Sequence, residues 1–284
     1  MTSVPTGFPF PRLTRALKGF AHEWNQVGSQ TAFYFKAIGL IRYALVHYKL
    51  EVLRVVASMS MGVGALIVVG GSVVIIMTLV GSVATSSGLL GHEQLAHIGV
   101  DALGGFFSAY FLTRIAFPLI TDVGLAATIG AAATAQIGAM RIAEEIDALE
   151  VMGIRTIAYL VSTRIMGAVL VAIPLFCMGA EAGYLAFRVV YALGFGQGVG
   201  VYNHYFTTYL KPTDLVWSLI EVLVTAFLIM LVHTYYGFNA SGGPAGVGEA
   251  VGRAVRASLA LSVTSTLVIG MAVYGTTGDF NLSG

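Results

Sequence analysis

Apolar residues gather along the chain into runs long enough to cross a bilayer, which takes roughly 20 apolar residues in a helix. Five such runs predict transmembrane helices at about residues 55–84, 98–140, 157–187, 215–236 and 257–274. Polar or glycine-rich stretches at residues 85–97, 141–155, 193–214 and 237–256 predict the segments that connect them. The pattern therefore predicts an all-α, polytopic membrane protein with about five transmembrane helices.

The second run is too long for one simple span, and Arg114, Pro118 and Asp122 interrupt it. Proline removes a backbone donor and kinks a helix, so the run predicts either one interrupted span or a short re-entrant piece followed by a span. Ionisable side chains inside a membrane are costly and mark functional candidates. Arg114, Asp122 and Glu221 are therefore candidate polar residues. We expect no direct Arg114–Asp122 pair, and Glu221 either lines a polar cavity or bonds to a neighbouring helix.

Small residues repeat at every fourth position in the later part of this run. The repeat consists of Ala127, Ala131, Ala135 and Ala139. Gly130, Thr134 and Gly138 form the adjacent stripe. Small residues at this spacing let helix backbones approach closely where lipid provides no hydrophobic force. The repeat predicts a helix packed in the heart of the bundle or in a dimer interface, and the alternative is an ordinary alanine-rich helix.

Residues 1–54 are basic and aromatic without a continuous apolar core, so no cleavable signal is expected. They predict an N-terminal interfacial helix on the membrane surface, or else a flexible cytosolic tail, ahead of a transmembrane domain at 55–284. Five crossings put this segment, residues 141–155 and residues 237–256 on one face, which collects most of the Lys and Arg. By the positive-inside rule that face is cytoplasmic, and the C-terminus lies outside the plasma (inner) membrane.

Composition narrows the functional classes further. Hydrophobic residues make up 57% of the chain and charged residues 10%, against about 25% charged in soluble domains. The net charge of +1 gives no reason to expect a nucleic acid partner. Cys177 is the single cysteine, and the His92–His97 spacing does not match a helical zinc motif. No metal or cofactor is therefore expected in this chain. No P-loop motif occurs in the sequence either, so ATP hydrolysis would belong to another polypeptide.

The charged segment around residues 141–153 predicts a short amphipathic helix at the cytoplasmic face. Its apolar stripe consists of Ile142, Ile146, Leu149 and Met152. Glu144, Asp147 and Glu150 lie on a different side, and Gly153 supplies a helix stop. An acidic helix suits a basic groove of a protein partner better than anionic lipid. It predicts a coupling helix that seats in an ATPase, with Glu144, Glu145 and Asp147 as polar contacts, whereas the alternative is a solvated linker.

Two sequence stretches resemble a known family. EEIDALEVMGI, followed by AYLVSTR, is similar to the signature of the MlaE/YrbE permease family, and GGPAGVGEAVGRAV is similar to the glycine-rich loop before its last helix. The ending HTYYGFNASGGPAGVGEAVGRAVRASL resembles the B-type YrbE subunits of actinobacterial Mce systems, especially their sterol-importing branch. The resemblance implies a heterodimer with an A-type YrbE permease, a cytoplasmic ABC ATPase dimer, extracytoplasmic Mce proteins and a lipid substrate.

The chain also departs from the family pattern. Ile115 follows Arg114 where many members have glutamate, Gln136 stands where others have glutamate, and Thr163 replaces a proline. Ala127 and Thr128 stand where others have Gly-Arg. The loss of several membrane charges predicts a subunit specialised within an unequal pair.

Three other classes remain open on the residues alone. An ion-coupled secondary transporter or channel would need a convergent set of membrane carboxylates, for which Asp122 and Glu221 are few. A membrane enzyme would need a paired acidic or His/Cys constellation, and a structural scaffold would need no flux at all. The resemblance favours lipid import, with sterol ahead of fatty or mycolic acids.

Overall fold

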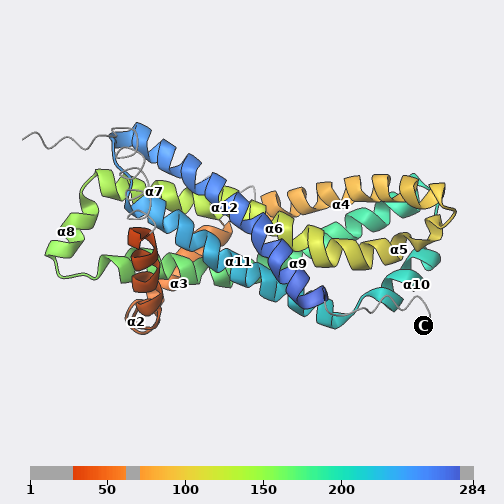
Figure 1. Ribbon diagram of the computed structural model, residues 1–284, viewed down its shortest axis with the longest axis horizontal. Coiled ribbons are helices and arrows are strands. Elements are labelled where there is room, and N and C mark those ends of the chain that lie inside the picture. Colours follow the sequence, from red (N-terminus) through yellow and green to blue (C-terminus); the bar gives the residue numbers. More distant parts are fainter. Residues whose placement is uncertain (1–27, 62–70, 276–284) are drawn as a thin grey trace, which may run out of the picture.

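The computed structural model describes residues 28–61 and 71–275, which are mostly helical and contain no strand. The bundle is elongated, with α8 (Glu145–Val151) at one end and α5 (Gly104–Phe107) and α10 (Val199–Tyr209) towards the other (Figure 1). Within these described residues, five helical stretches are long and apolar enough to cross a membrane: Gly71–His97, Asp101–Ile142, Ile157–Gly194, Pro212–Phe238 and Gly243–Tyr274. The predicted fold class and number of spans are confirmed.

The first span begins and ends later than predicted. Helix α3 (Lys49–Met61) precedes it, residues 62–70 lie outside the described part, and α4 (Gly71–His97) forms the span itself. The polar loop expected at 85–97 is therefore wrong, because α4 continues to His97. The hydroxyls of Thr85 and Ser86 donate to carbonyls four residues earlier at 2.8 and 3.0 Å, so these polar side chains are satisfied inside a helix.

The second span is one continuous helical stretch, so neither the interruption nor the re-entrant piece occurs. Its order is α5, the π-helical η3 (Ser108–Ala116), α6 (Phe117–Leu125), the π-helical η4 (Ala126–Gly130) and α7 (Ala131–Ile142). Pro118 lies in the first turn of α6, directly after the π-helical segment. A wide π turn changes the hydrogen-bond register there, so the missing N–H of proline does not end the helix.

The third, fourth and fifth spans complete the bundle, and two predicted loops turn out to be largely helical. The third span joins the π-helical η5 (Ile157–Ser162), α9 (Thr163–Val189) and the π-helical η6 (Val190–Gly194). Helix α10 occupies much of the expected loop at 193–214. Helix α11 (Pro212–Phe238) is followed by α12 (Gly243–Tyr274), which takes in most of the glycine-rich stretch at 237–256. Pro244 in its first turn is pre-set for a helix start.

Helix α9 lies in the centre of the bundle, and α3 and α4 pack on successive parts of it. Val55 of α3 packs near its start, and Ile76 and Val80 of α4 pack farther along. At Gly183 a Cβ atom would come within 2.4 Å of the Phe117 ring, so α6 and α9 approach each other closely there. Residues of the second and third spans, with α4, thus form the main apolar core.

The described N-terminal residues pack one side against the bundle. The Phe33 ring centroid lies 5.5 Å from those of Tyr235 and Phe238, and Ser162 Oγ donates to the Ala37 carbonyl at 2.9 Å. Phe35 is 72% exposed on the other side. This distribution agrees with an interfacial helix, which stays a prediction, and residues 1–27 of that segment lie outside the described part.

At the end opposite α8, helix α10 closes against the start of the second span. Tyr202 is buried and its hydroxyl donates to Ser108 Oγ at 2.9 Å. Burial raises the pKa of the Tyr202 phenol, which therefore stays a neutral donor at physiological pH.

Candidate functional site

Helix α8 forms a short connection between the second and third spans. Its start is a tight turn in which Glu144 has a φ of 58°, a left-handed conformation that few non-glycine residues adopt. Gly153, with a φ of 80°, follows its end as predicted. The single helix expected over 141–153 is instead divided, because Arg141 and Ile142 belong to the last turn of α7. The turn sets α8 at an angle to the spans (Figure 1).

One side of α8 is anchored in the bundle. Ile146 is fully buried and clusters with Ile137 of the second span and Leu160 of the third. Leu149 is half-buried in the same cluster, and Phe238 of the fourth span packs against it. A displacement of α8 would therefore act on three spans at once, because close-packed side chains transmit movement.

The other side of α8 is acidic at its start and apolar at its end. Glu144, Glu145 and Asp147 are exposed, and Asp147 accepts a 2.7 Å ion pair from Arg141. Val151 is 89% exposed and Met152 66%. Met152 therefore does not share the buried position of Ile146, so the apolar stripe expected from the sequence is split between an inner and an outer part.

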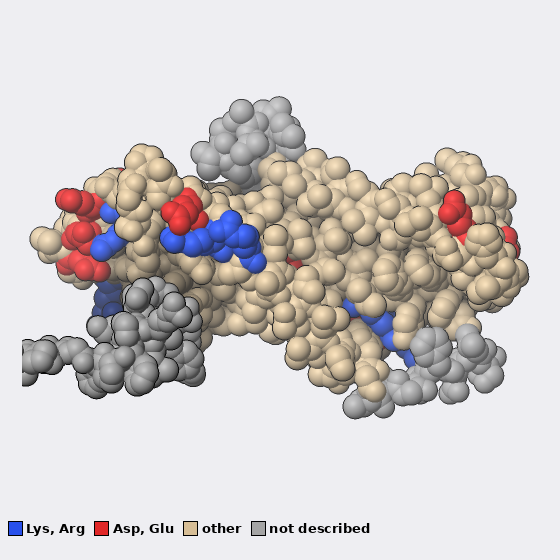
Figure 2. All heavy atoms as spheres, turned by 45° about the horizontal axis from the view of Figure 1, so that its top comes forward, with Lys and Arg blue, Asp and Glu red and all other residues tan. Residues whose placement is uncertain are grey.

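Charged side chains gather at the end of the molecule that carries α8. Figure 2 shows acidic and basic residues together there, beside a largely uncharged surface over the middle of the bundle. Ion pairs at this end join Arg141 to Asp147 and Arg253 to Glu249. An uncharged belt next to a charged end matches a helical bundle that enters the bilayer from an aqueous compartment.

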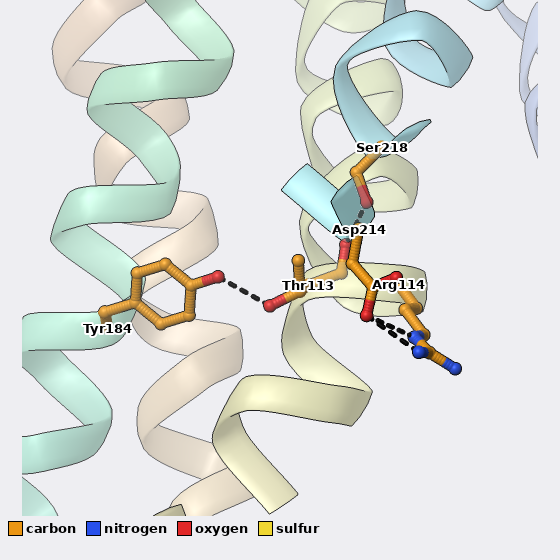
Figure 3. Close-up of polar contacts among 5 residues, drawn as sticks. All are labelled: Thr113, Arg114, Tyr184, Asp214 and Ser218. Carbon is orange, nitrogen blue, oxygen red and sulfur yellow. Dashed lines mark hydrogen bonds and ion pairs between the residues drawn. The ribbon is translucent and has the colours of Figure 1, made fainter. Parts of the chain in front are cut away.

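A second polar site lies farther from α8, where η3 meets α11. Arg114 Nε and Nη2 donate to one oxygen of Asp214 at 2.9 and 2.7 Å (Figure 3). The side chains of this pair are 14% and 8% exposed. Ser218 Oγ donates to the Thr113 carbonyl at 2.6 Å, so the fourth span is attached to the second at two successive residues.

Neighbouring groups extend this junction to the third and fifth spans. Thr113 Oγ1 and the Tyr184 hydroxyl are 2.5 Å apart, which links η3 to α9 (Figure 3). The Arg114 guanidinium lies 3.9 Å from the Tyr110 ring centroid and 4.4 Å from that of Tyr274 in α12. Such cation–π contacts add to the ion pair. Arg114 therefore does not pair with Asp122, as predicted, and its partner Asp214 was missed.

The other two predicted membrane residues, Asp122 and Glu221, are both buried inside the bundle and lie near enough to interact electrostatically. Asp122 in α6 is 0% exposed and Glu221 in α11 is 1% exposed. Sequence spacing gave no sign that these two carboxyl groups, almost one hundred residues apart, are neighbours.

The alanine repeat points away from the bundle. Ala127 and Ala139 are exposed, and Ala131 and Ala135 are half-buried. The adjacent stripe faces inward, where Thr134 Oγ1 lies 2.8 Å from His233 Nδ1. The far nitrogen of His233 lies 3.0 Å from Ser258 Oγ, so this buried histidine joins the second, fourth and fifth spans. Sequence analysis missed His233, although an ionisable residue in an apolar span is a sufficient signal.

A cavity of about 430 Å³ opens beside the alanine repeat, between α3, α4, α7 and α9. Val55, Met59, Ile75 and Ala132 give it apolar walls, while Gln136 and Arg164 supply polar groups. Pockets that bind small apolar ligands combine such walls with a few polar groups.

The family model described as Permease MlaE matches residues 54–272. A probable ABC transporter permease protein of Rickettsia bellii is 31% identical over 160 residues, which are 56% of this chain and 61% of that protein. The matched region thus spans less than two thirds of that relative. A probable ABC transporter permease protein of Synechocystis is 28% identical over 192 residues, covering 66% of this chain and 71% of the relative. TRIGALACTOSYLDIACYLGLYCEROL 1 of Arabidopsis thaliana is 27% identical over 193 residues, which cover 66% of this chain and 53% of that protein.

Proposed function

Because the chain belongs to the MlaE permease family, we propose that it is the membrane-spanning subunit of an ATP-driven lipid transporter. The observation that carries this proposal is the position of α8, which is acidic outside and anchored by Ile146 to three spans. The similarity to probable ABC transporter permease proteins of Rickettsia bellii and Synechocystis supports it. ATP hydrolysis would come from a separate ATPase dimer, since no P-loop motif occurs in this sequence.

In this proposal the end with α8 faces the cytoplasm and the C-terminus lies outside the plasma membrane. The exposed Glu144, Glu145 and Asp147 contact basic groups of the ATPase, and Val151 and Met152 fill an apolar part of its cleft. Closure of the ATPase on ATP pushes α8, and Ile146 passes the movement to the spans. The charge distribution of Figure 2 and the exposure of Val151 and Met152 support this arrangement.

The outward alanine repeat is proposed as the contact with a second permease. Close helix approach through small residues is a common way to associate in lipid, and the 430 Å³ cavity lies directly beside that face. The partner proposed from the sequence resemblance is an A-type YrbE chain. Mce proteins would deliver the lipid from outside. A sterol or related hydrophobic lipid is the proposed substrate, and this choice rests on the B-type YrbE resemblance.

Reversing the charge of Asp147 tests the role of α8. Asp147→Lys is expected to lower ATP-driven lipid transfer by roughly tenfold or more, the scale of coupling energies between two sites. ATP hydrolysis should continue, because the variant changes an exposed side chain and leaves the ATPase intact. Transfer and hydrolysis are measured together on the complex purified from its native membrane and reconstituted in liposomes.

Glu249→Lys is the matched control, since it reverses one member of another exposed ion pair at the same end of the molecule. It should transfer lipid like the wild type. Equal loss in both variants would assign the effect to general charge change, and wild-type transfer in Asp147→Lys would rule out the proposed contact.

A photo-crosslinking residue at position 135 tests the permease contact. We expect an adduct that contains two permease chains, because Ala135 lies on the outward small-residue face. Mass spectrometry of the adduct distinguishes a second copy of this chain from an A-type relative. The same probe at Leu185, which is 58% exposed on α9, should give no permease adduct. Crosslinking to a permease at 185 and not at 135 would place the interface elsewhere.

A further inference from the structure

The interior of the bundle contains oxygen atoms from three helices without hydrogen-bond partners. Both carboxylate oxygens of Asp122 in α6 and Oε1 of Glu221 in α11 have none among the described residues. The two side chains are 0% and 1% exposed, so within this chain they have no contact with solvent. A buried polar group without a partner is expensive, and a buried charge without one far more so.

Two threonine hydroxyls belong to the same cluster. Thr225 lies beside the Asp122 carboxyl, and Thr266 of α12 lies beside that of Glu221. Both are buried, and neither hydroxyl has a hydrogen-bond partner in the described chain. Other threonines in these spans donate to the carbonyl four residues earlier, as Thr128 does at 2.6 Å. The hydroxyls of Thr225 and Thr266 are thus available to the two carboxyl groups.

Cations near this cluster are already engaged. Arg114, eight residues before Asp122, makes its ion pair with Asp214. Of the helices packed on α6, α11 faces Asp122 with Glu221, and α12 places Tyr274 near Glu221. On the side of α9, Tyr184 bonds to Thr113. The ionisable residues of α4 are His92, Glu93 and His97, near its far end. Asp122 and Glu221 thus face like charge without a described counter-ion.

From this arrangement we infer that Asp122 and Glu221 form a proton-binding pair in the membrane interior. Two neighbouring ionised carboxylates in a dry environment are strongly disfavoured, and such pairs titrate as a unit. Each proton comes from water, forms an O–H bond to a carboxylate oxygen and removes one negative charge. A protonated carboxyl can donate to its partner or to Thr225, so binding also satisfies the open acceptors.

The site joins α6, α11 and α12, and the Arg114 junction connects the same three spans through η3, which directly precedes α6. A relative movement of these helices would change the distance between the two carboxyl groups and with it their hold on the protons. Proton uptake or release would then accompany the conformational change. This inference does not depend on lipid transport, because the pair lies within one chain and can be measured without substrate or ATPase.

Infrared spectroscopy of the full chain in lipid nanodiscs tests the inference, because the carbonyl band of a protonated carboxyl group is separate from that of a carboxylate. At pH 7 we expect a protonated band in the wild type, since exposed carboxyl groups are ionised there. The band should weaken in Asp122→Asn and in Glu221→Gln and disappear in the double variant. Glu93→Gln, which removes an exposed carboxyl of α4, should leave it unchanged.

A wild-type spectrum without the protonated band at pH 7 would overturn the inference, whatever the variants do. A band that is present only without Na⁺ or K⁺, and is lost when either ion is added, would overturn it in favour of a metal cation. A band that survives in a folded double variant would place the protons on other groups.

Discussion

Arg114→Ala is expected to lower the free energy of unfolding by about 3–5 kcal/mol, the usual effect of removing one partner of a buried ion pair. Asp214 is 8% exposed and would be left buried without its ion-pair partner. The substitution also removes the contacts with the Tyr110 and Tyr274 rings. The second span therefore loses contacts with both the fourth and the fifth spans. Denaturant or thermal unfolding in mild detergent, followed by intrinsic fluorescence, measures the loss.

The double variant Arg114→Ala/Asp214→Ala separates charge from packing. It should be more stable than Arg114→Ala alone, because no buried charge is then left unpaired. Arg54→Ala is the control, since the Arg54 side chain is 78% exposed and its ion pair with Glu51 should contribute about 1 kcal/mol or less. If Arg114→Ala proved as mild as Arg54→Ala, the junction would not hold the spans together.

Gly105→Ala should separate α10 from the second span. A Cβ atom at position 105 would lie 2.2 Å from the Tyr202 carbonyl oxygen and 2.7 Å from the Phe206 nitrogen. Both contacts are with backbone, so no side-chain rotation can relieve them, and α10 itself must move. We expect a loss of at least about 1–3 kcal/mol, the range for overpacked sites, and faster proteolysis within 195–211.

Gly200→Ala is the matched control within α10. A Cβ atom there meets nothing within 4 Å, and alanine favours a helix over glycine by about 1 kcal/mol. The control should therefore be neutral or stabilising. Equal protection of both variants from protease would mean that α10 does not depend on the close approach at Gly105.

The sequence predicted the spans well because a bilayer demands long apolar helices, and those runs are visible without knowledge of their neighbours. It failed at residues 85–97, where α4 continues into polar residues, and at 193–214, where α10 forms a separate helix outside the apolar runs. Polar side chains there are satisfied by hydroxyl bonds within the helix, and α10 packs on distant residues; a hydropathy pattern records neither. The starts of the first and fifth spans and the ends of the first and third were misplaced for the same reason, whereas the other span boundaries lie within three residues of the prediction.

The candidate sites were likewise predictable where the sequence itself marks a residue, and not where the site depends on packing between spans. Arg114, Asp122 and Glu221 stood out because charge is rare in apolar spans, whereas their neighbours depend on how the spans pack. Asp214 was missed as the partner of Arg114, one hundred residues away. The contact of α8 with an ATPase and the contact of the alanine repeat with a second permease stay predictions, since the structure contains neither the ATPase nor the second permease.

The π-helical segments of the second and third spans have a consequence for mapping these helices. A π turn contains more residues than an α turn, so each π-helical segment shifts the direction in which the following side chains point relative to a regular α-helix. Residues before and after Ser108–Ala116 therefore do not share one helical wheel. Arg114 and Asp122 can therefore interact with different neighbours although they lie in one continuous helical span. Any scanning study of lipid-facing positions must restart its phase at η3, η4, η5 and η6.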